Sequence, residues 1–133
     1  MARYDFLNLN PLDELENDCV NRAIALALNE DYLLIQRKLE LVGELFECEK
    51  LCVCCYKFLL DEIYGLERIE EYAGCTIEEF SQYHPKGTYL IRVDNHLTTL
   101  IDGTVYDIWD CRGEIVRIVW VVDKNKFFAW FYY

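Results

Sequence analysis

The sequence predicts a single α+β domain, with helices in its first half and an antiparallel β-sheet in its second half. Apolar residues recur at helical spacing over about residues 12–65, whereas short β-rich runs separated by turn residues fill residues 88–133. The chain has 133 residues, which is enough for one hydrophobic core but not for two. We therefore expect residues 1–133 to form one domain, in which the helices pack on a β-sheet meander.

Three helices are expected after a lead-in that turns at Asn10-Pro11. Asn17 or Asp18 can cap the first helix, because these side chains accept hydrogen bonds from the free N–H groups of a first turn. Its expected buried face consists of Val20, Ala23, Ile24, Ala27 and Leu28. The second helix should begin near Asp31, with an apolar stripe of Ile35, Leu39, Val42 and Phe46 and further leucines at 34, 41 and 45. Gly65 is a plausible end for the third helix.

After Gly65 the periodicity changes from helical to extended. Thr76 and Glu79 form a capping-box pattern that predicts a short helical turn. Five strands then follow, at Thr88–Val93, His96–Ile101, Thr104–Trp109, Glu114–Val122 and Lys126–Tyr133. Residues 114–122 are apolar on both faces, so this strand should lie in the interior of the sheet.

Composition excludes several classes of function. The formal net charge is −11, which argues against nonspecific nucleic-acid binding and against anionic membrane surfaces. No run reaches the roughly 20 apolar residues that span a bilayer, and residues 1–10 lack the apolar core of a signal peptide. The seven cysteines are an odd number, so we expect reduced thiols and a cytoplasmic location rather than a disulfide framework.

The most informative stretch runs from His96 to Cys111. Asp102-Gly103 is a strong signal for a two-residue hairpin turn, and a turn centred there places residues 96 and 109 opposite each other. His96 then lies near Asp107 on one side and Asp110 on the other. A change of one residue in the turn would exchange the aspartate that faces the imidazole ring.

A histidine held by a carboxylate is half of a nucleophilic site, and Cys19 is the candidate nucleophile. It lies at the start of a predicted helix, where free N–H groups and the helix dipole stabilise a thiolate. His96 can act as the base, and Asp110 or Asp107 can fix its tautomer. The N–H of Cys19, together with the Asn17 side chain, could stabilise an oxyanion.

A purely structural interpretation competes with this site. Cysteine is among the most buried residue types, and most single cysteines serve only as small apolar side chains. His84 is the only other histidine that could act as a base, and its position before Pro85 in a turn predicts exposure to solvent.

Several motifs in order resemble the small papain-like proteins of phages, prophages and bacterial genomes. The motifs are Asp18-Cys-Val-Asn-Arg-Ala-Ile-Ala25, Gly74-Cys-Thr76, Pro85-Lys-Gly-Thr-Tyr-Leu-Ile-Arg-Val93, His96-Leu-Thr-Thr-Leu-Ile-Asp-Gly103 and Tyr106-Asp-Ile-Trp-Asp110. This resemblance covers nearly the whole chain and extends distantly to bacteriocin-processing peptidases and transglutaminase cores. It implies a papain-like fold with Cys19 as nucleophile, His96 as base and Asp110 as the orienting acid, with Asp107 as the alternative. The family's glutamine before the cysteine is missing here.

The cysteines at 48, 52, 54 and 55 raise the alternative of a metal site. Zinc sites usually combine two cysteine pairs, or one pair with histidines, and no second pair follows this cluster. On a helix, Cys48, Cys52 and Cys55 fall on one face with Leu59, which is the pattern of a core stripe. We therefore expect core packing at this cluster, and no metal or other cofactor for the protein.

Two functions follow from the sequence. The first is a cysteine peptidase or related thiol hydrolase, which cleaves a peptide or amide bond of a protein or peptide substrate through an acyl-enzyme on Cys19. The second is a catalytically inactive papain-fold binding protein of phage origin that engages a host protein. The sequence identifies neither the substrate nor the oligomeric state.

Overall fold

The computed structural model describes residues 2–47 and 53–123, and these form helices packed on a sheet. The helices are α1 (Cys19–Leu28), α2 (Tyr32–Phe46), α3 (Val53–Phe58), the π-helical turn η1 (Leu59–Ile63) and α4 (Ile77–Tyr83). The strands are β1 (Arg3–Phe6), β2 (Glu67–Ile69), β3 (Thr88–Val93), β4 (His96–Ile101), β5 (Thr104–Asp107) and β6 (Ile118–Val122).

The six strands form one mixed sheet in the order β1-β5-β4-β3-β6-β2. All neighbours are antiparallel except β1 and β5, which run parallel. The β3–β4 and β4–β5 connections are tight hairpins, so β4 lies in the interior of the sheet with its first residue, His96, at one end.

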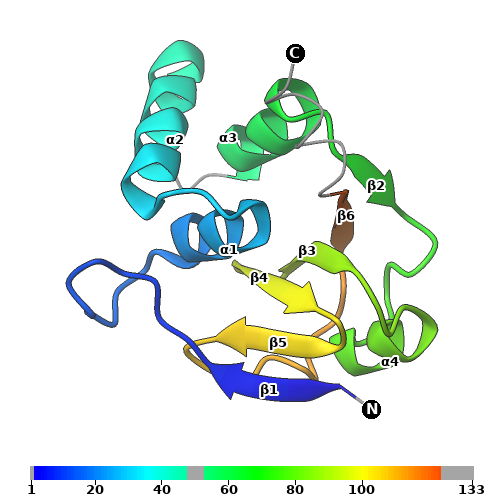
Figure 1. Cartoon of the computed structure of the whole chain (residues 1–133). Helices are drawn as coiled ribbons and strands as arrows, with labels where there is room; N and C mark the ends of the chain where they lie inside the picture. The colour runs from blue at the N-terminus through cyan, green and yellow to red at the C-terminus, as the bar shows by residue number, and fades with distance from the viewer. Residues whose placement is uncertain (1, 48–52, 124–133) are drawn as a thin grey trace.

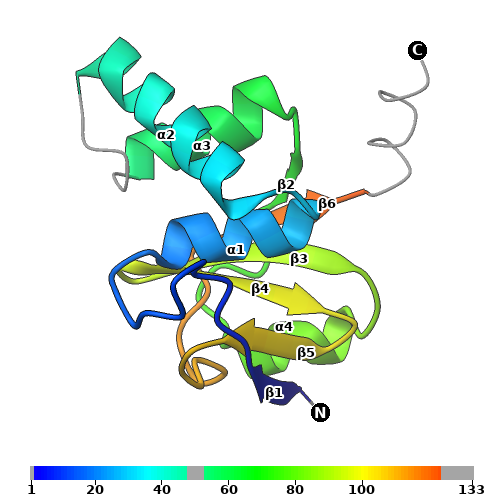
Figure 2. The same ribbon diagram turned by 60° about the vertical axis from the view of Figure 1, so that its left-hand side comes forward.

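Helices cover both faces of this sheet. Helix α1 lies across β4 and β3, and α2 and α3 pack on the other side of α1, while α4 lies on the opposite face of the sheet (Figures 1 and 2). Each face of the sheet has its own hydrophobic core, one beneath α1 and one beneath α4. Because side chains alternate along a strand, β3 contributes to both cores. Leu90 packs in the core beneath α1, whereas Tyr89 and Ile91 pack in the core beneath α4.

The expected α+β class is confirmed, and so are most of the predicted elements. Asp31 caps α2 through its side chain, and Thr76 and Glu79 form both halves of the capping box of α4. Strands β3 and β4 have the expected bounds, and Asp102 and Gly103 have the positive φ angles of 47° and 79° that a two-residue hairpin turn requires. Strand β6 lies between β3 and β2, in the sheet interior as expected.

The expectation of a purely antiparallel sheet was wrong, because β1 pairs in parallel with β5. Two short strands, β1 and β2, were not predicted. Strand β1 falls in the stretch interpreted as a lead-in, and β2 falls where no element was expected. Both are edge strands of three or four residues with little burial, so no alternation of apolar and polar residues reveals them. Strands β5 and β6 are also shorter than expected, and the predicted strand at 126–133 lies outside the described residues.

Helix α2 departs from its predicted burial at one position. Three residues of the predicted stripe are buried as expected, namely Ile35, Leu39 and Val42. Phe46 is 48% exposed, and its ring makes an edge-to-face contact with that of Phe58, with ring centroids 4.7 Å apart. Among the described residues, no helix has both the length and the apolar composition needed to span a bilayer.

The packing of α1 on the sheet gives a stability prediction. Ile24 is fully buried between α1 and the sheet, so Ile24→Ala should lower the free energy of unfolding by about 2–5 kcal/mol through lost burial and a new cavity. Urea denaturation followed by circular dichroism measures this change. Leu34→Ala on the exposed side of α2 is the matched control, and an equal loss in both variants would contradict the assignment of the core.

Candidate active site

The β4–β5 hairpin places His96 beside Asp107. The pairs Thr99–Tyr106 and Ile101–Thr104 set the register, which carries Asp107 to the strand position opposite Thr98. His96 lies two residues before Thr98 in β4, and its side chain therefore points to the same face of the sheet. Its Nε2 lies 2.6 Å from Asp107 Oδ2, and the side chains of both residues are more than nine-tenths buried.

The expectation that Asp110 contacts His96 was wrong. Asp107 is the last residue of β5 and shares the face of Thr98 and His96, whereas Asp110 lies beyond the end of the strand. Asp110 instead forms an exposed bidentate ion pair with Arg112, with distances of 2.7 and 2.9 Å. The alternative, Asp107, is the residue that contacts the imidazole, and Trp109 packs its ring 4.9 Å from that of His96.

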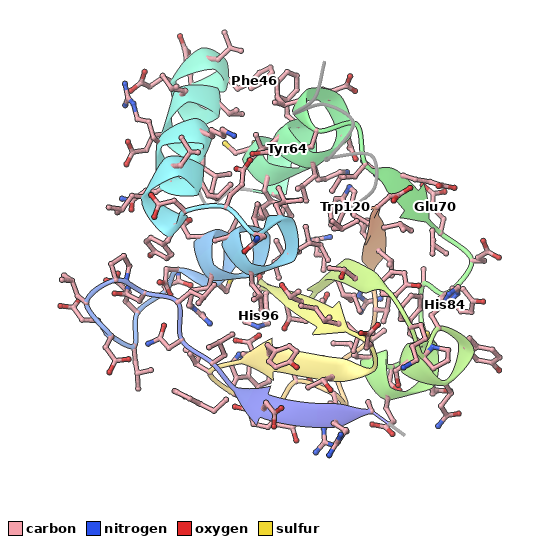
Figure 3. All side chains as sticks on the ribbon, in the orientation of Figure 1. Phe46, Tyr64, Glu70, His84, His96 and Trp120 are labelled. Carbon is pink, nitrogen blue, oxygen red and sulfur yellow. The ribbon has the colours of Figure 1, made fainter. Side chains whose placement is uncertain are left out.

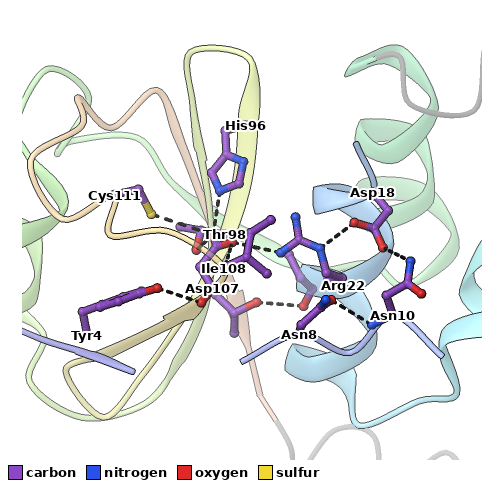
Figure 4. A network of polar contacts seen from close by, with 12 residues as sticks. Tyr4, Asn8, Asn10, Asp18, Arg22, His96, Thr98, Asp107, Ile108 and Cys111 are labelled. Atoms are coloured by element: carbon purple, nitrogen blue, oxygen red, sulfur yellow. Dashed lines mark hydrogen bonds and ion pairs between the residues drawn. The ribbon is translucent and has the colours of Figure 1, made fainter. Parts of the chain in front are cut away.

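The Asp107 carboxylate accepts hydrogen bonds from several directions (Figure 4). Oδ2 accepts from Thr98 Oγ1 at 2.6 Å in addition to His96, and the Cys111 thiol lies 3.9 Å away. Oδ1 accepts from Arg22 Nη1 at 3.0 Å and from the backbone N–H of Ile108 at 2.7 Å. Burial on its own raises the pKa of Asp107, but the hydrogen bond and charge of His96 lower it below its ordinary value.

Cys19 is the first residue of α1, and its half-buried thiol interacts electrostatically with the imidazole of His96. Burial on its own raises the pKa of this thiol. The hydrogen bond to His96, one from the backbone of Leu97, and the positive charges of His96 and Arg22 outweigh burial and lower the pKa. The structure therefore brings together Cys19, His96 and Asp107, three of the residues predicted from the sequence.

His96 is stabilised in its protonated form. Burial lowers the pKa of the imidazole, but the hydrogen bond to Asp107, together with those to Cys111 and Cys19, raises it to about 11. A protonated His96 beside a thiol with a lowered pKa is the arrangement of a thiolate–imidazolium ion pair. This electrostatic pattern is the one that activates a cysteine for nucleophilic attack.

Arg22 is a residue of the site to which the sequence analysis gave no role. It is only 6% exposed and bridges two carboxylates, with Nε 2.7 Å from Asp18 Oδ1 and Nη1 3.0 Å from Asp107 Oδ1. Arg22 thus joins α1 to the end of β5. The sequence did carry a signal for it, because an arginine stands among the apolar positions of a predicted buried helix face, four residues after an aspartate.

Asp18 and Asn17 behave differently from expectation. Asp18 is the N-cap of α1, but its side chain makes no capping hydrogen bond and instead accepts from Arg22, from Tyr32 Oη at 2.7 Å and from Asn10 Nδ2 at 3.1 Å. Asn17, the expected oxyanion donor, is exposed, and among the described residues it has no hydrogen-bond partner. Its position does not support that role.

Cys111 is a second thiol at the site, although the sequence presented it as isolated. It is fully buried, and its Sγ, a nitrogen of His96 and a carboxylate oxygen of Asp107 lie within 4.8 Å of one another. These three groups are donors that zinc accepts. Two ligands on one tetrahedral zinc lie about 3.3 Å apart, whereas the 2.6 Å contact between His96 and Asp107 is a hydrogen-bond distance. The geometry therefore fits a hydrogen-bonded dyad.

The other candidate residues lie elsewhere. His84, expected to be exposed, is half-buried in an aromatic cluster, stacked on Phe80 with ring centroids 4.8 Å apart, and Figure 3 shows it well away from His96. Cys55 is buried and Cys54 is exposed, whereas Cys48 and Cys52 lie outside the described residues.

Comparison of the chain with models of protein families, with curated proteins and with solved structures finds no match.

The two aspartates give a direct prediction. Asp107→Asn leaves Arg22 and His96 buried without their shared anion, so the free energy of unfolding should fall by about 3–5 kcal/mol. Asp110→Asn, which breaks only an exposed pair, should leave the urea midpoint nearly unchanged. A larger loss from Asp110→Asn than from Asp107→Asn would show that the hairpin register is shifted by one residue.

Proposed function

We propose that this protein is a papain-like cysteine peptidase or thiol hydrolase that acts on a peptide or amide bond through Cys19, His96 and Asp107. The observation that carries the proposal is the ordered contact of these three side chains, with the thiol at a helix start, the imidazole at a strand start and the carboxylate behind it. Asp107 takes the place that the family resemblance suggested for Asp110.

In the first step the Cys19 thiolate attacks the carbonyl carbon of the substrate, and the π electrons of the C=O bond move onto its oxygen. The tetrahedral intermediate collapses, the C–N bond breaks, and His96 gives its proton to the leaving amine. A thioester on Cys19 remains. His96, now neutral, takes a proton from water, and the resulting hydroxide attacks the thioester. The carboxylic acid is released, and the Cys19 thiolate beside protonated His96 is restored.

Asp107 supports both halves of this cycle without changing its own protonation. Its hydrogen bond to Nε2 fixes the imidazole orientation, which leaves the other ring nitrogen free to face the thiol. Thr98, Arg22 and the Ile108 N–H hold the carboxylate in turn, so rotation of either group would break several hydrogen bonds at once.

We also propose that the protein works on a protein or peptide substrate in the cytoplasm, which is the bacterial host cytosol if a phage encodes the chain. Within the described part of the chain, Cys19, Cys75 and Cys111 carry free thiols, as a reducing compartment favours.

The second candidate function is an inactive papain-fold protein that binds a host protein. The observation in its favour is a group of exposed apolar side chains on α2, namely Leu33, Leu34, Leu41 and Leu45. Such exposure is typical of a surface that contacts another macromolecule. The reactivity of Cys19 separates the two functions.

The pH dependence of iodoacetamide labelling, read by mass spectrometry at each of the seven cysteines, tests the proposed activity. Because the pKa of Cys19 is lowered, its thiolate should persist below the ordinary value of 9.0 and label faster than the other cysteines at neutral pH. In His96→Ala the hydrogen bond and charge are lost while burial remains, so the labelling midpoint should move to higher pH.

Cys75 provides the matched control, because burial raises the pKa of its thiol and it lies apart from His96. Its labelling profile should be the same in His96→Ala as in the unaltered protein. A Cys19 profile that does not move in His96→Ala would exclude the ion pair and favour the binding protein.

A further inference from the structure

Helix α2 carries a row of leucines on the side that faces away from the rest of the fold. Its inner face packs on α1 and α3, and it stands at the outer edge of the helices in Figure 1. Leu34, Leu41 and Leu45 lie on the outer face and are between 47% and 69% exposed. These positions are seven and four residues apart, so their side chains form one stripe along the helix. An exposed apolar stripe of this kind is typical of a contact surface.

Two opposite charges accompany this leucine stripe. Arg37 lies between Leu34 and Leu41, and Glu44 lies about one turn after Leu41. Both charged side chains are exposed, and the ion pair of Arg37 with Glu40 is long, at 3.5 Å. An exposed pair of this length contributes little, so Arg37 can exchange it for a better partner. The stripe therefore has a basic first half and an acidic second half.

The leucine stripe is complementary to itself about a two-fold axis. A helix rises about 1.5 Å per residue, so positions along an antiparallel pair of α2 helices follow from the sequence. With the axis level with residue 40, Leu34 lies about 9 Å along the helix, and Leu45 of the second copy lies about 7.5 Å along in the same direction. Leu41 lies within about 1.5 Å of the axis and faces its own equivalent. One alignment thus stacks three layers of leucine.

The same alignment pairs the charges. Arg37 lies about 4.5 Å from the axis, and Glu44 of the second copy lies about 6 Å from it in the same direction. The symmetry forms this pair twice. A parallel pair of helices would instead place Arg37 against Arg37 and Glu44 against Glu44, and like charges that face each other are costly. The charges therefore favour the antiparallel pair.

The net charge of the chain singles out α2 as a place where two copies can meet. The formal net charge is −11, so two copies repel each other as whole molecules. Helix α2 balances two basic residues, Arg37 and Lys38, against two acidic residues, Glu40 and Glu44. A second copy therefore meets no excess of like charge on this helix and brings the opposite charge to each end of the stripe.

We infer that α2 is a self-association surface, through which two copies of the chain form an antiparallel dimer with two-fold symmetry. One helix per copy supplies less than the roughly 800 Å² per partner of a standard interface, so the dimer is weak, with a dissociation constant on the order of 100 μM. The inference goes beyond the proposed function and does not depend on the chemistry of Cys19. It gives the exposed leucines a partner without a host protein.

Sedimentation velocity of the full chain between about 10 μM and about 1 mM tests the dimer. Leu41→Glu places two carboxylates against each other at the axis, so it should weaken association at least about tenfold. Leu12→Glu adds the same charge at an exposed leucine before α1 and should associate like the unaltered protein. An unaltered protein that stays monomeric throughout would overturn the inference and leave the leucines to another macromolecule. Equal association of Leu41→Glu would overturn it by placing the contact elsewhere.

Two charge variants test the antiparallel pairing. Arg37→Glu and Glu44→Arg each set like charges against each other in both pairs, so each variant alone should associate at least about tenfold more weakly. In an equimolar mixture every glutamate faces an arginine, and association should return to that of the unaltered protein. This recovery also shows that both variants are folded.

Undiminished association of each charge variant alone would overturn the antiparallel dimer, because a parallel pair already sets like charges against each other and would lose nothing. A mixture that stays as monomeric as its two components would overturn it as well, since the pairing of Arg37 with Glu44 would then have no part in the contact.

Discussion

The buried carboxylate of Asp107 is the interaction on which the rest of the site depends. It stands at the end of β5 and accepts hydrogen bonds from His96, Thr98, Arg22 and its neighbour's backbone N–H. A carboxylate with so many donors stays ionised in a buried place. Through His96 it acts on the Cys19 thiol, and through Arg22 it fixes the helix that carries the thiol. One anion therefore influences both the ionisation and the position of the Cys19 thiol.

Much of the fold could be predicted, because local sequence patterns indicate its main helices and strands. Apolar spacing identified α1 and α2, the capping box identified α4, and the Asp102-Gly103 turn fixed the β4–β5 hairpin. Strands β1 and β2 could not be found in the same way. They are short edge strands whose position depends on pairing with β5 and β6, and tertiary contacts of this kind leave little trace in local sequence.

The sequence predicted that part of the site which the hairpin register determines, namely His96 and the aspartate that faces it. From the sequence, either Asp107 or Asp110 could face His96, depending on the turn register, and the observed pairing of Thr99 with Tyr106 decides for Asp107. The contact of Arg22 with Asp107 needed the three-dimensional structure, because the two residues are 85 positions apart in sequence. Cys111 is only four residues from Asp107, but it follows the end of β5, where strand alternation no longer gives the direction of a side chain. The overlooked arginine shows that a charged residue on an apolar helix face should be examined for a buried partner.

The protonation state of His96 tests the central claim most directly. Nitrogen-15 NMR of histidine-labelled protein, with His96→Ala to assign the signals, distinguishes an imidazolium from a neutral ring at about pH 8, where an ordinary histidine is neutral. The account predicts that both nitrogens of His96 carry protons there and that this state is lost in Asp107→Asn. A neutral His96 at that pH in the unaltered protein would contradict it, since no thiolate–imidazolium pair could then exist at Cys19.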